Sequence, residues 1–415
     1  MLLMLILAAC GDGGNGGNGG NGGTQASEDC DPSVLEPAQE VASAASTDGS
    51  YKLAQAKPDV VIGTFGDRTG ENSQIIVPSH NAMELAVRQA NEAGDLPVNL
   101  VFRALDNRDG RPDTAPAIAQ QFIGDPSVVA VLGGGFSGET AATGQLLADA
   151  GLLFFSASAT RPDLTEQGWE TFFRGLANDN DQGTAVIDAF EHLGCQRIAI
   201  IDDKSQYGEG LGNVAAQEAE AAGLEIVLDE SIEPTTDYTA LVDSVIAADP
   251  QAVFYSGYAA QFQLVARQLR ERGYEGVIAS GDGSKEEDIG ESIGPEDAEN
   301  VLLTCPCPDI NLSDDPDAQA FVETYEEQFN ERPAIYAAEG YDVANTTIAA
   351  IRTCGEDGPE AVTRECVVDN VRQSNYEGIT KTMEFEENGQ VRTGAVSLFV
   401  IRDGVVREVG PVNEL

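Results

Sequence analysis

Short apolar runs alternate along this chain with longer segments in which apolar residues recur at helical spacing. Gly, Asp or Pro bounds most of the runs, and in residues 81–91 the side chains of Met83, Val87 and Ala90 fall on one helix face. Strands buried on both faces read as continuous apolar runs, and alternating strands and helices build parallel sheets covered on both sides. The strands predicted in this way are residues 60–62, 98–105, 128–132, 152–155, 197–201, 224–228, 252–255, 277–279 and 301–304.

The number of predicted strands indicates two lobes, because it exceeds what one small open sheet holds comfortably. A chain of 415 residues is also long enough for two domains of ordinary size. The order changes after residue 310, and helical periodicity dominates residues 315–372. An Asn388-Gly389 turn is then predicted to join two extended stretches, residues 382–385 and 395–402.

The N-terminus is an apolar run that ends in Leu7-Ala8-Ala9-Cys10. The run is shorter than the roughly 20 apolar residues that span a bilayer. Although no Lys or Arg precedes it, the run resembles a bacterial lipoprotein signal, in which the cysteine becomes the lipidated N-terminus. We therefore expect residues 1–10 to be a signal peptide with lipidation at Cys10. The alternative is an ordinary apolar N-terminus with a chance cysteine.

The segment after Cys10 is of low complexity. Gly/Asn repeats extend through Gly23, and a polar stretch rich in Ala and Ser follows. Such a composition packs no core, so residues 11–57 are predicted to be a flexible tether. A lipid anchor followed by a tether predicts a protein that works outside the cytoplasm, held at a membrane surface by its lipid.

The charge balance is strongly acidic. The chain has 70 Asp and Glu residues against 23 Lys and Arg, which gives a formal net charge of −47. A surface of this sign repels nucleic acid and anionic lipid, so neither is an expected partner. The acidic residues show no calcium-loop spacing, and we interpret them as a solvated coat.

The chain has seven cysteines, and disulfides are permitted outside the cytoplasm. Cys354 and Cys366 flank a loop that contains Gly and Pro, and they are the best candidate pair. Cys305-Pro306-Cys307 is expected to be too tight for an easy mutual bridge, and the sequence assigns no partner to the others. No His lies near a Cys pair, so no zinc site is expected.

Motifs for catalysis and for cofactor binding are incomplete. The segment from Gly133 to Thr140 nearly matches a phosphate-binding loop, but Glu139 stands where the motif needs Lys and would repel phosphate. The same segment misses a nucleophile elbow by one residue. Of the two histidines, His80 is expected at a helix start and His192 near a helix end. We therefore expect no enzyme activity, cofactor or metal.

Two predicted strands end in turns rich in Ser. Ser137 follows the strand at 128–132, and the segment from Ser156 to Thr160 follows the strand at 152–155. If Ser137 and Thr160 are helix N-caps, the free backbone N–H groups behind them would suit a carboxylate. Ligands of open α/β sheets bind at the carboxyl ends of strands. The alternative is that both residues are plain caps without a ligand.

Several motifs in the same order resemble those of a known family. The chain resembles the Leu/Ile/Val-binding periplasmic proteins, the type I substrate-binding proteins of ABC importers, over about residues 58 to 405. The motifs are Ala130-Val131-Leu132-Gly133 through Ser137, Phe155-Ser156-Ala157-Ser158-Ala159-Thr160 through Thr165, Phe172-Phe173-Arg174, Asp203-Lys204-Ser205-Gln206-Tyr207-Gly208-Glu209-Gly210, and Tyr336-Ala337-Ala338-Glu339-Gly340-Tyr341-Asp342-Val343.

The resemblance implies an α/β fold of two doubly wound parallel-sheet lobes joined by a hinge of three crossings. The crossings would fall near Leu176, Pro306 and Gly394. Lobe one would then hold residues 58–176 and 307–393, and lobe two residues 177–306 and 394–410.

The resemblance also implies a ligand site for an α-amino acid. Ser137 would hold the ligand carboxylate, and Thr160 would contact carboxylate and ammonium. Ser158 would offer its backbone carbonyl to the ammonium. Asp282 would be the acidic partner of that ammonium.

Aromatic residues would complete the implied site. Tyr207 and Tyr258 would close over the ligand, and Tyr336 would form the wall against its side chain. Two departures from the family pattern change this site: Ile75 or Ile76 stands where the family often has an aromatic, and Gly110 and Phe136 replace a disulfide. Other amino acids, amides and urea-like solutes are therefore open as ligands.

The implied function is that of a lipid-anchored, extracytoplasmic solute receptor without enzyme activity. Its partners would be a small molecule, expected to be an amino acid, and the membrane permease of an ABC importer, with the receptor itself a monomer. One alternative is a chemosensory receptor that reports the ligand rather than importing it. Another is an extracytoplasmic enzyme on a related scaffold, against which the scarcity of His argues.

Overall fold

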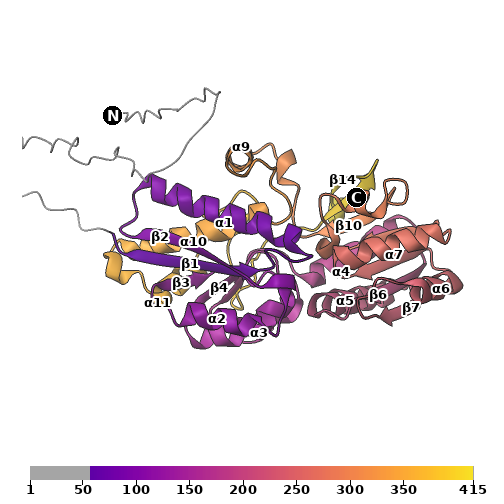
Figure 1. The fold of residues 1–415 in the computed structure, drawn as a ribbon, viewed down its shortest axis with the longest axis horizontal. Coiled ribbons are helices and arrows are strands. Elements are labelled where there is room, and N and C mark those ends of the chain that lie inside the picture. The colour runs from indigo at the N-terminus through magenta and orange to yellow at the C-terminus, as the bar shows by residue number, and fades with distance from the viewer. Residues whose placement is uncertain (1–56, 415) are drawn as a thin grey trace, which may run out of the picture. The chain divides into compact units, whose positions relative to one another are not determined.

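The computed structural model describes residues 57–414, which form two α/β lobes (Figure 1). The predicted signal, the tether up to residue 56, Cys10 and Cys30 lie outside this range. The first lobe is built on a five-stranded parallel sheet of order β2-β1-β3-β4-β5. Its strands are β1 (Asp59–Gly66), β2 (Asn99–Asp106), β3 (Val128–Val131), β4 (Leu153–Ser156) and β5 (Phe172–Arg174).

Helices cover both faces of the first sheet. Consecutive residues of β4 point to opposite faces: Phe154 packs with Phe65 beneath α2 and α3, whereas Phe155 packs with Phe173 beneath α1, α10 and α11. The strands β1, β3 and β4 are buried on both faces, which explains why they read as apolar runs. The helices that cover the sheet are α1 (Ser73–Ala93), α2 (Ala115–Ile123), α3 (Ser137–Asp149), α10 (Ala337–Gly355) and α11 (Arg364–Arg372), and α9 (Pro316–Phe329) packs on α1 and on the start of α10.

The second lobe is built on a seven-stranded sheet of order β14-β13-β10-β9-β8-β6-β7. The five strands β10, β9, β8, β6 and β7 are parallel, and β13 and β14 extend the sheet in antiparallel fashion. Helices α4 and α5 pack on one face, and α6, α7 and α8 on the other. The strands are β6 (Arg197–Asp202), β7 (Glu225–Ser231), β8 (Ala252–Ser256), β9 (Val277–Ser280), β10 (Leu302–Cys305), β13 (Ser397–Arg402) and β14 (Val405–Pro411); the helices are α4 (Asp179–His192), α5 (Gln206–Ala222), α6 (Thr239–Ala248), α7 (Ala259–Glu271) and α8 (Ile289–Ile293).

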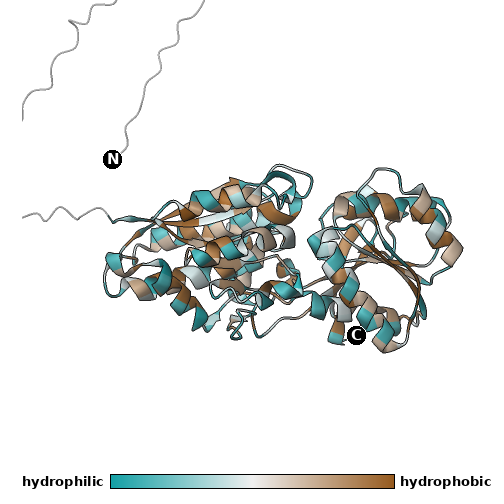
Figure 2. Cartoon of the chain, turned by 90° about the horizontal axis from the view of Figure 1, so that it is seen from below, coloured by the Kyte–Doolittle hydropathy of each residue, from teal (hydrophilic) through white to brown (hydrophobic). Residues whose placement is uncertain are grey.

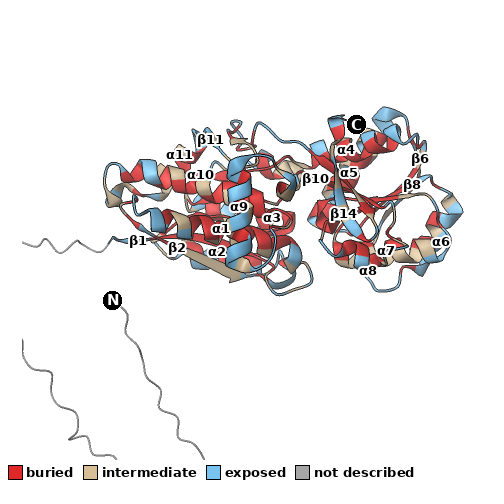
Figure 3. Ribbon diagram, turned by 90° about the horizontal axis from the view of Figure 1, so that it is seen from above, coloured by how far each residue is buried: buried red, intermediate tan, exposed pale blue. Residues whose placement is uncertain are grey.

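Hydropathy and burial follow these layers. The strands are the hydrophobic centre of each lobe, and the outer helix faces are hydrophilic (Figure 2). The strands and the inner helix faces are also the buried parts (Figure 3). The α/β architecture with two parallel-sheet lobes is therefore confirmed.

The chain passes between the lobes three times. It leaves the first sheet after β5, leaves the second sheet after β10 to form α9, α10 and α11, and returns to the second sheet at β13. Helix α10 consequently lies beside α1, far from it in sequence (Figure 1). At the last crossing Gly394 packs against Ala177, leaving no room for a side chain at position 394. The exact lobe boundaries stay a prediction.

The apolar runs predicted as strands coincide with β1 to β4 and β6 to β10. The predicted hairpin after residue 380 is wrong. Strand β12 (Thr382–Met383) pairs with β11 (Tyr376–Glu377), and the Asn388-Gly389 turn closes only an isolated bridge between Phe385 and Val391. The second extended stretch instead crosses to the other lobe, where β13 pairs with β10 and β14.

The expected position of His80 is also wrong. Helix α1 begins at Ser73 and continues through Pro78, so His80 lies inside the helix rather than at its start. Proline removes one backbone hydrogen bond but does not end this helix. His80 is buried, its Nε2 lies 2.9 Å from the Thr64 hydroxyl oxygen, and burial lowers its pKa to about 3. His192 lies in the last turn of α4, as expected.

Two disulfides occur in the described part of the chain. Cys354 and Cys366, the pair favoured by the sequence, are joined between α10 and α11. The expectation that Cys305 and Cys307 are too close to bridge is wrong, because they are joined as well. The chain turns at Pro306 as it leaves β10, which sets the two Cα atoms 5.0 Å apart. That separation is within the usual range for disulfides.

Between residues 57 and 414, none of the helices has the length and apolar character needed to cross a bilayer. The same residues contain no group of three or more His, Cys, Asp or Glu side chains that could hold a metal ion.

Candidate functional site

A small cavity between the lobes is lined by every ligand-binding residue expected from the sequence. The first lobe contributes one wall, which includes Tyr336 at the start of α10. The second lobe contributes the opposite wall. The lining residues are Ile75, Gly135, Phe136, Ser137, Ser158, Thr160 and Tyr336 on one side, and Tyr207, Tyr258, Asp282 and Gly283 on the other.

The sheet topology explains why these residues meet. Ser137 follows β3 and Ser158 follows β4, at the carboxyl edge of the first sheet. Tyr258 follows β8, and Asp282 follows β9, at the same edge of the second sheet. Since the carboxyl ends of parallel strands lie at one edge, each sheet presents its loops to the space between the lobes.

The turn before Ser137 depends on glycine. Gly134 has a φ of +25°, and a Cβ there would lie 2.8 Å from the Thr140 hydroxyl oxygen. Phe136, which has an extended backbone, is the N-cap of α3, so Ser137 is the first helical residue and not the cap that the sequence suggested. The Ser137 hydroxyl oxygen accepts a hydrogen bond from the Arg161 N–H at 3.2 Å.

The loop after β4 also differs from its prediction. Thr160 is not a helix N-cap, because Pro162 starts only a short 3-10 helix, η3 (Pro162–Glu166), whose cap is Arg161. The Ser158 hydroxyl donates to the Gly135 carbonyl at 2.8 Å and ties the two loops together. The Thr160 hydroxyl is buried and forms no hydrogen bond with the protein.

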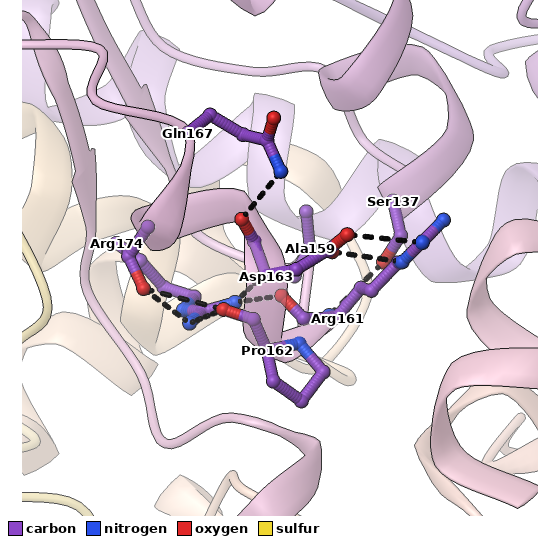
Figure 4. A network of polar contacts seen from close by, with 8 residues as sticks. Ser137, Ala159, Arg161, Pro162, Asp163, Gln167 and Arg174 are labelled. Atoms are coloured by element: carbon purple, nitrogen blue, oxygen red, sulfur yellow. Dashed lines mark hydrogen bonds and ion pairs between the residues drawn. The ribbon is translucent and has the colours of Figure 1, made fainter. Parts of the chain in front are cut away.

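Arg174 holds this loop in place through main-chain atoms (Figure 4). Its guanidinium donates to the carbonyl oxygen of Arg161 at 2.6 Å and to that of Ala159 at 3.4 Å. It also donates to the side-chain oxygen of Gln390 at 2.8 Å, and the backbones of Arg174 and Gln390 form an isolated bridge. Arg174 is fully buried, which lowers its pKa to about 10 and still leaves it protonated at neutral pH.

Asp282 is the acidic group that faces the cavity. The Tyr207 hydroxyl donates to Oδ1 at 2.9 Å, and the Tyr336 hydroxyl, from the other lobe, donates to Oδ2. Burial raises the pKa of Asp282, and the hydroxyl donors oppose that rise. Asp282 is therefore a buried carboxylate for which a cation would be a favourable partner.

A second buried acid, Asp179, lies beside the site and was missed from the sequence. It is the first residue of α4, directly after the first crossing, and its N–H donates to the Thr160 carbonyl at 2.9 Å. Burial, and then the charge of Asp282, hold the pKa of Asp179 well above its usual range. In sequence Asp179 stands in an Asn178-Asp179-Asn180-Asp181 run that reads as an ordinary helix start, so only its position after β5 could have marked it.

Apolar side chains close the rest of the cavity. The Phe136 ring meets Tyr258 edge-on at 5.2 Å between centroids, and Tyr258 in turn packs on Tyr207 at 5.3 Å. Phe136 also covers Gly110, where a Cβ would collide with the ring. Ile75 lines the cavity, as the sequence departure indicated.

The arrangement is complementary to a small zwitterion. The Ser137 hydroxyl is a neutral donor that suits an anion, and the Asp282 carboxylate suits a cation. The aromatic and aliphatic surface between them suits an apolar group. Neither His, Cys nor Lys is among the residues that line this cavity.

Known proteins match most of the described chain. The family model for periplasmic binding proteins matches residues 59–404. A Leu-, Ile-, Val-, Thr- and Ala-binding protein of Pseudomonas aeruginosa is 26% identical over 347 residues, which cover 83% of this chain and 90% of that protein.

Solved structures share the fold. A leucine-binding protein of Thermotoga maritima superposes with a TM-score of 0.77 at 24% identity, covering 86% of this chain and all of its own. A branched-chain amino acid binding protein of Streptococcus pneumoniae, solved with isoleucine, gives 0.76 at 24% identity, covering 85% of this chain and all of its own. Because the family model spans nearly all of the described residues, the chain belongs to the periplasmic binding proteins.

Proposed function

We propose that this protein is the extracytoplasmic amino-acid-binding component of an ABC importer. The observation that carries the proposal is the buried Asp282 carboxylate, which shares one small cavity with the neutral Ser137 hydroxyl. An α-amino acid carries one anionic and one cationic group close together, which is the pattern these side chains complement. The family match and the relative named for Leu, Ile, Val, Thr and Ala binding support the same ligand class.

The carboxylate of the ligand would lie at the Ser137 hydroxyl and the backbone N–H of Thr160. Its ammonium would lie at Asp282, the Ser158 carbonyl and the Thr160 hydroxyl oxygen. Tyr207, Tyr258 and Tyr336 would surround the side chain. The wall formed by Ile75 and Phe136 is aliphatic and aromatic, which favours an apolar side chain.

Ligand binding would shift an equilibrium between separated and closed lobes. The lining residues come from both lobes, so a ligand that contacts all of them has higher affinity for the closed arrangement. Such a ligand would stabilise the closed form, and a membrane permease would recognise both lobes together. The proposal includes lobe boundaries at residues 176/177, 306/307 and 393/394, and a ligand released chemically unchanged.

A lipid on Cys10, a flexible tether and a monomeric receptor would keep the binding lobes near the permease. The composition of residues 1–57 supports this part of the proposal.

The test is a thermal-shift screen of the common amino acids, amides and urea, followed by calorimetry with the strongest ligand and by NMR of the recovered ligand. We expect one or a few amino acids to raise the melting temperature, to bind at one site per chain and to be recovered unchanged. If no amino acid binds and a neutral amide or urea does, the amino-acid assignment is wrong. A chemically altered ligand would overturn the assignment as a non-enzymatic receptor.

A further inference from the structure

The Asp179 carboxylate is buried without a partner. Its residue is 0% exposed, and neither carboxylate oxygen accepts a hydrogen bond from the protein. A buried charged group without a hydrogen bond is costly, so a donor is needed to complete it. Arg174 is close enough to attract the carboxylate electrostatically, but its guanidinium N–H groups donate to the loop carbonyls and to the Thr165 and Gln390 side chains.

The Thr160 hydroxyl is the complementary group. It is 1% exposed, lines the ligand cavity and has no hydrogen-bond partner. The backbones of the two residues are joined by the Asp179 N–H to Thr160 carbonyl bond of 2.9 Å. The hydroxyl is also near enough to lower the pKa of the Asp179 carboxyl. Each side chain therefore offers the partner that the other lacks.

The direction of that hydrogen bond would decide what Thr160 presents to a ligand. A hydroxyl has one proton to donate and two lone pairs that accept. If the proton points to Asp179, the lone pairs face the cavity, and the oxygen suits a ligand group that only donates, such as an ammonium. Without an acceptor behind it, the hydroxyl is free to donate into the cavity.

We propose that Asp179 is a positioning residue that fixes Thr160 as a hydrogen-bond acceptor, so that the site selects an α-ammonium over an α-hydroxyl in a ligand of the same shape. This inference rests on the proposed function, since it concerns how an amino acid is recognised. An ammonium beside Asp282 would also offset the repulsion between the two carboxylates. The bound ammonium would therefore favour the ionised form of Asp179, which is the form that accepts from Thr160.

The experiment compares leucine with its 2-hydroxy analogue, 2-hydroxy-4-methylpentanoate, by calorimetry and competition. Asp179→Ala removes the acceptor and the charge, whereas Asp179→Asn keeps an amide oxygen and the shape. Asp188→Asn, an exposed position on the same helix, is the matched control. We expect Asp179→Ala to weaken leucine binding by about 10- to 100-fold. The affinity for the hydroxy acid should change little, Asp179→Asn should lie between, and the control should match the parent.

A thermodynamic cycle with Thr160→Val separates positioning from a structural role. If Asp179 acts through the hydroxyl, then Asp179→Ala made in the Thr160→Val background should add little further loss of leucine affinity. Equal losses for both ligands, or fully additive losses in the cycle, would overturn the inference while leaving the proposed function intact. If the parent protein binds no amino acid, the proposed function fails first, and this inference fails with it.

Discussion

Replacing Asp282 by Asn tests the proposed ligand pose most directly. The change preserves the size of a buried side chain and removes its charge. Tyr207 and Tyr336 both donate to the carboxylate, and only one of them would still face an amide oxygen. The other hydroxyl would meet the amide nitrogen and would have to turn to accept from it.

The expected loss follows from the burial of the site. Two unit charges about 4 Å apart attract by about 4 kcal/mol at an effective dielectric constant near 20. The two tyrosine hydroxyls already stabilise the negative charge by hydrogen bonds, and the ammonium must lose its bound water when it binds. Removing the charge of Asp282 should therefore weaken the binding free energy by about 2–5 kcal/mol. That corresponds to a loss of roughly 30- to 4000-fold in affinity.

The ligand-free protein should respond in the opposite direction. Burial raises the pKa of Asp282, which means that its charged form is unfavourable in the folded protein. Asp282→Asn removes that penalty, so the melting temperature without ligand should stay equal or rise at neutral pH. Asp288→Asn, exposed in the same loop region, is the control for the substitution itself.

Calorimetry with the amino acid that gives the largest thermal shift is the assay, with melting curves recorded without ligand. Weaker binding together with an unchanged or higher melting temperature is the expected pair of results. Unaltered affinity would refute the pairing of Asp282 with an ammonium. A strong drop in the melting temperature would refute the account of Asp282 as a group whose charge is a cost to the fold.

Further predictions concern other parts of the chain. Burial raises the pKa of Glu139 from 4.5 to about 8. The unfolded chain therefore loses this proton first as pH rises, and stability should fall by up to about 1.4 kcal/mol per pH unit across that window. Melting curves between pH 5 and pH 9 should show a shallower fall for Glu139→Gln than for the parent or for the exposed control Glu220→Gln; equal slopes would contradict this. Changing Cys354 and Cys366 to Ser should cost about 3 kcal/mol of unfolding free energy in denaturant titrations, because their disulfide closes a short loop, and an unchanged midpoint would show that the crosslink does not constrain the chain. Cys10→Ser should move the protein from the membrane to the soluble fraction, and retention with membranes would refute the lipid anchor.

Long apolar runs made most of the fold predictable. Most of the runs that coincide with strands are bounded by Gly, Asp or Pro, and central strands such as β3, β4 and β8 are buried along their whole length. In these strands the local pattern and the tertiary environment agree. The elements that were missed are different in kind. Strand β5 has only three residues, and β14 is a half-exposed edge strand whose alternating pattern is weak.

The remaining features could not be predicted because they depend on contacts between residues far apart in the sequence or on the local path of the backbone. The path of residues 382–402 is determined by a lobe crossing, which a turn signal at Asn388-Gly389 cannot reveal. Cys305 and Cys307 bridge because the backbone turns between them, which spacing alone does not show. The ligand-site residues could be named because they lie in motifs at strand ends, whereas Asp179 resembles a routine helix start until the fold brings it to Thr160.

The hydrogen bonds from Arg174 to the loop from Ala159 to Pro162 bear on how the ligand specificity of such a receptor evolves. Its bonds to that loop are made to carbonyl oxygens, apart from one to the Thr165 hydroxyl, so they do not depend on which side chains the loop carries. Substitutions on the cavity wall can therefore alter the chemistry offered to a solute while the path of the backbone is conserved. A lineage could acquire a new nutrient by single replacements in this loop without rebuilding the scaffold that holds it.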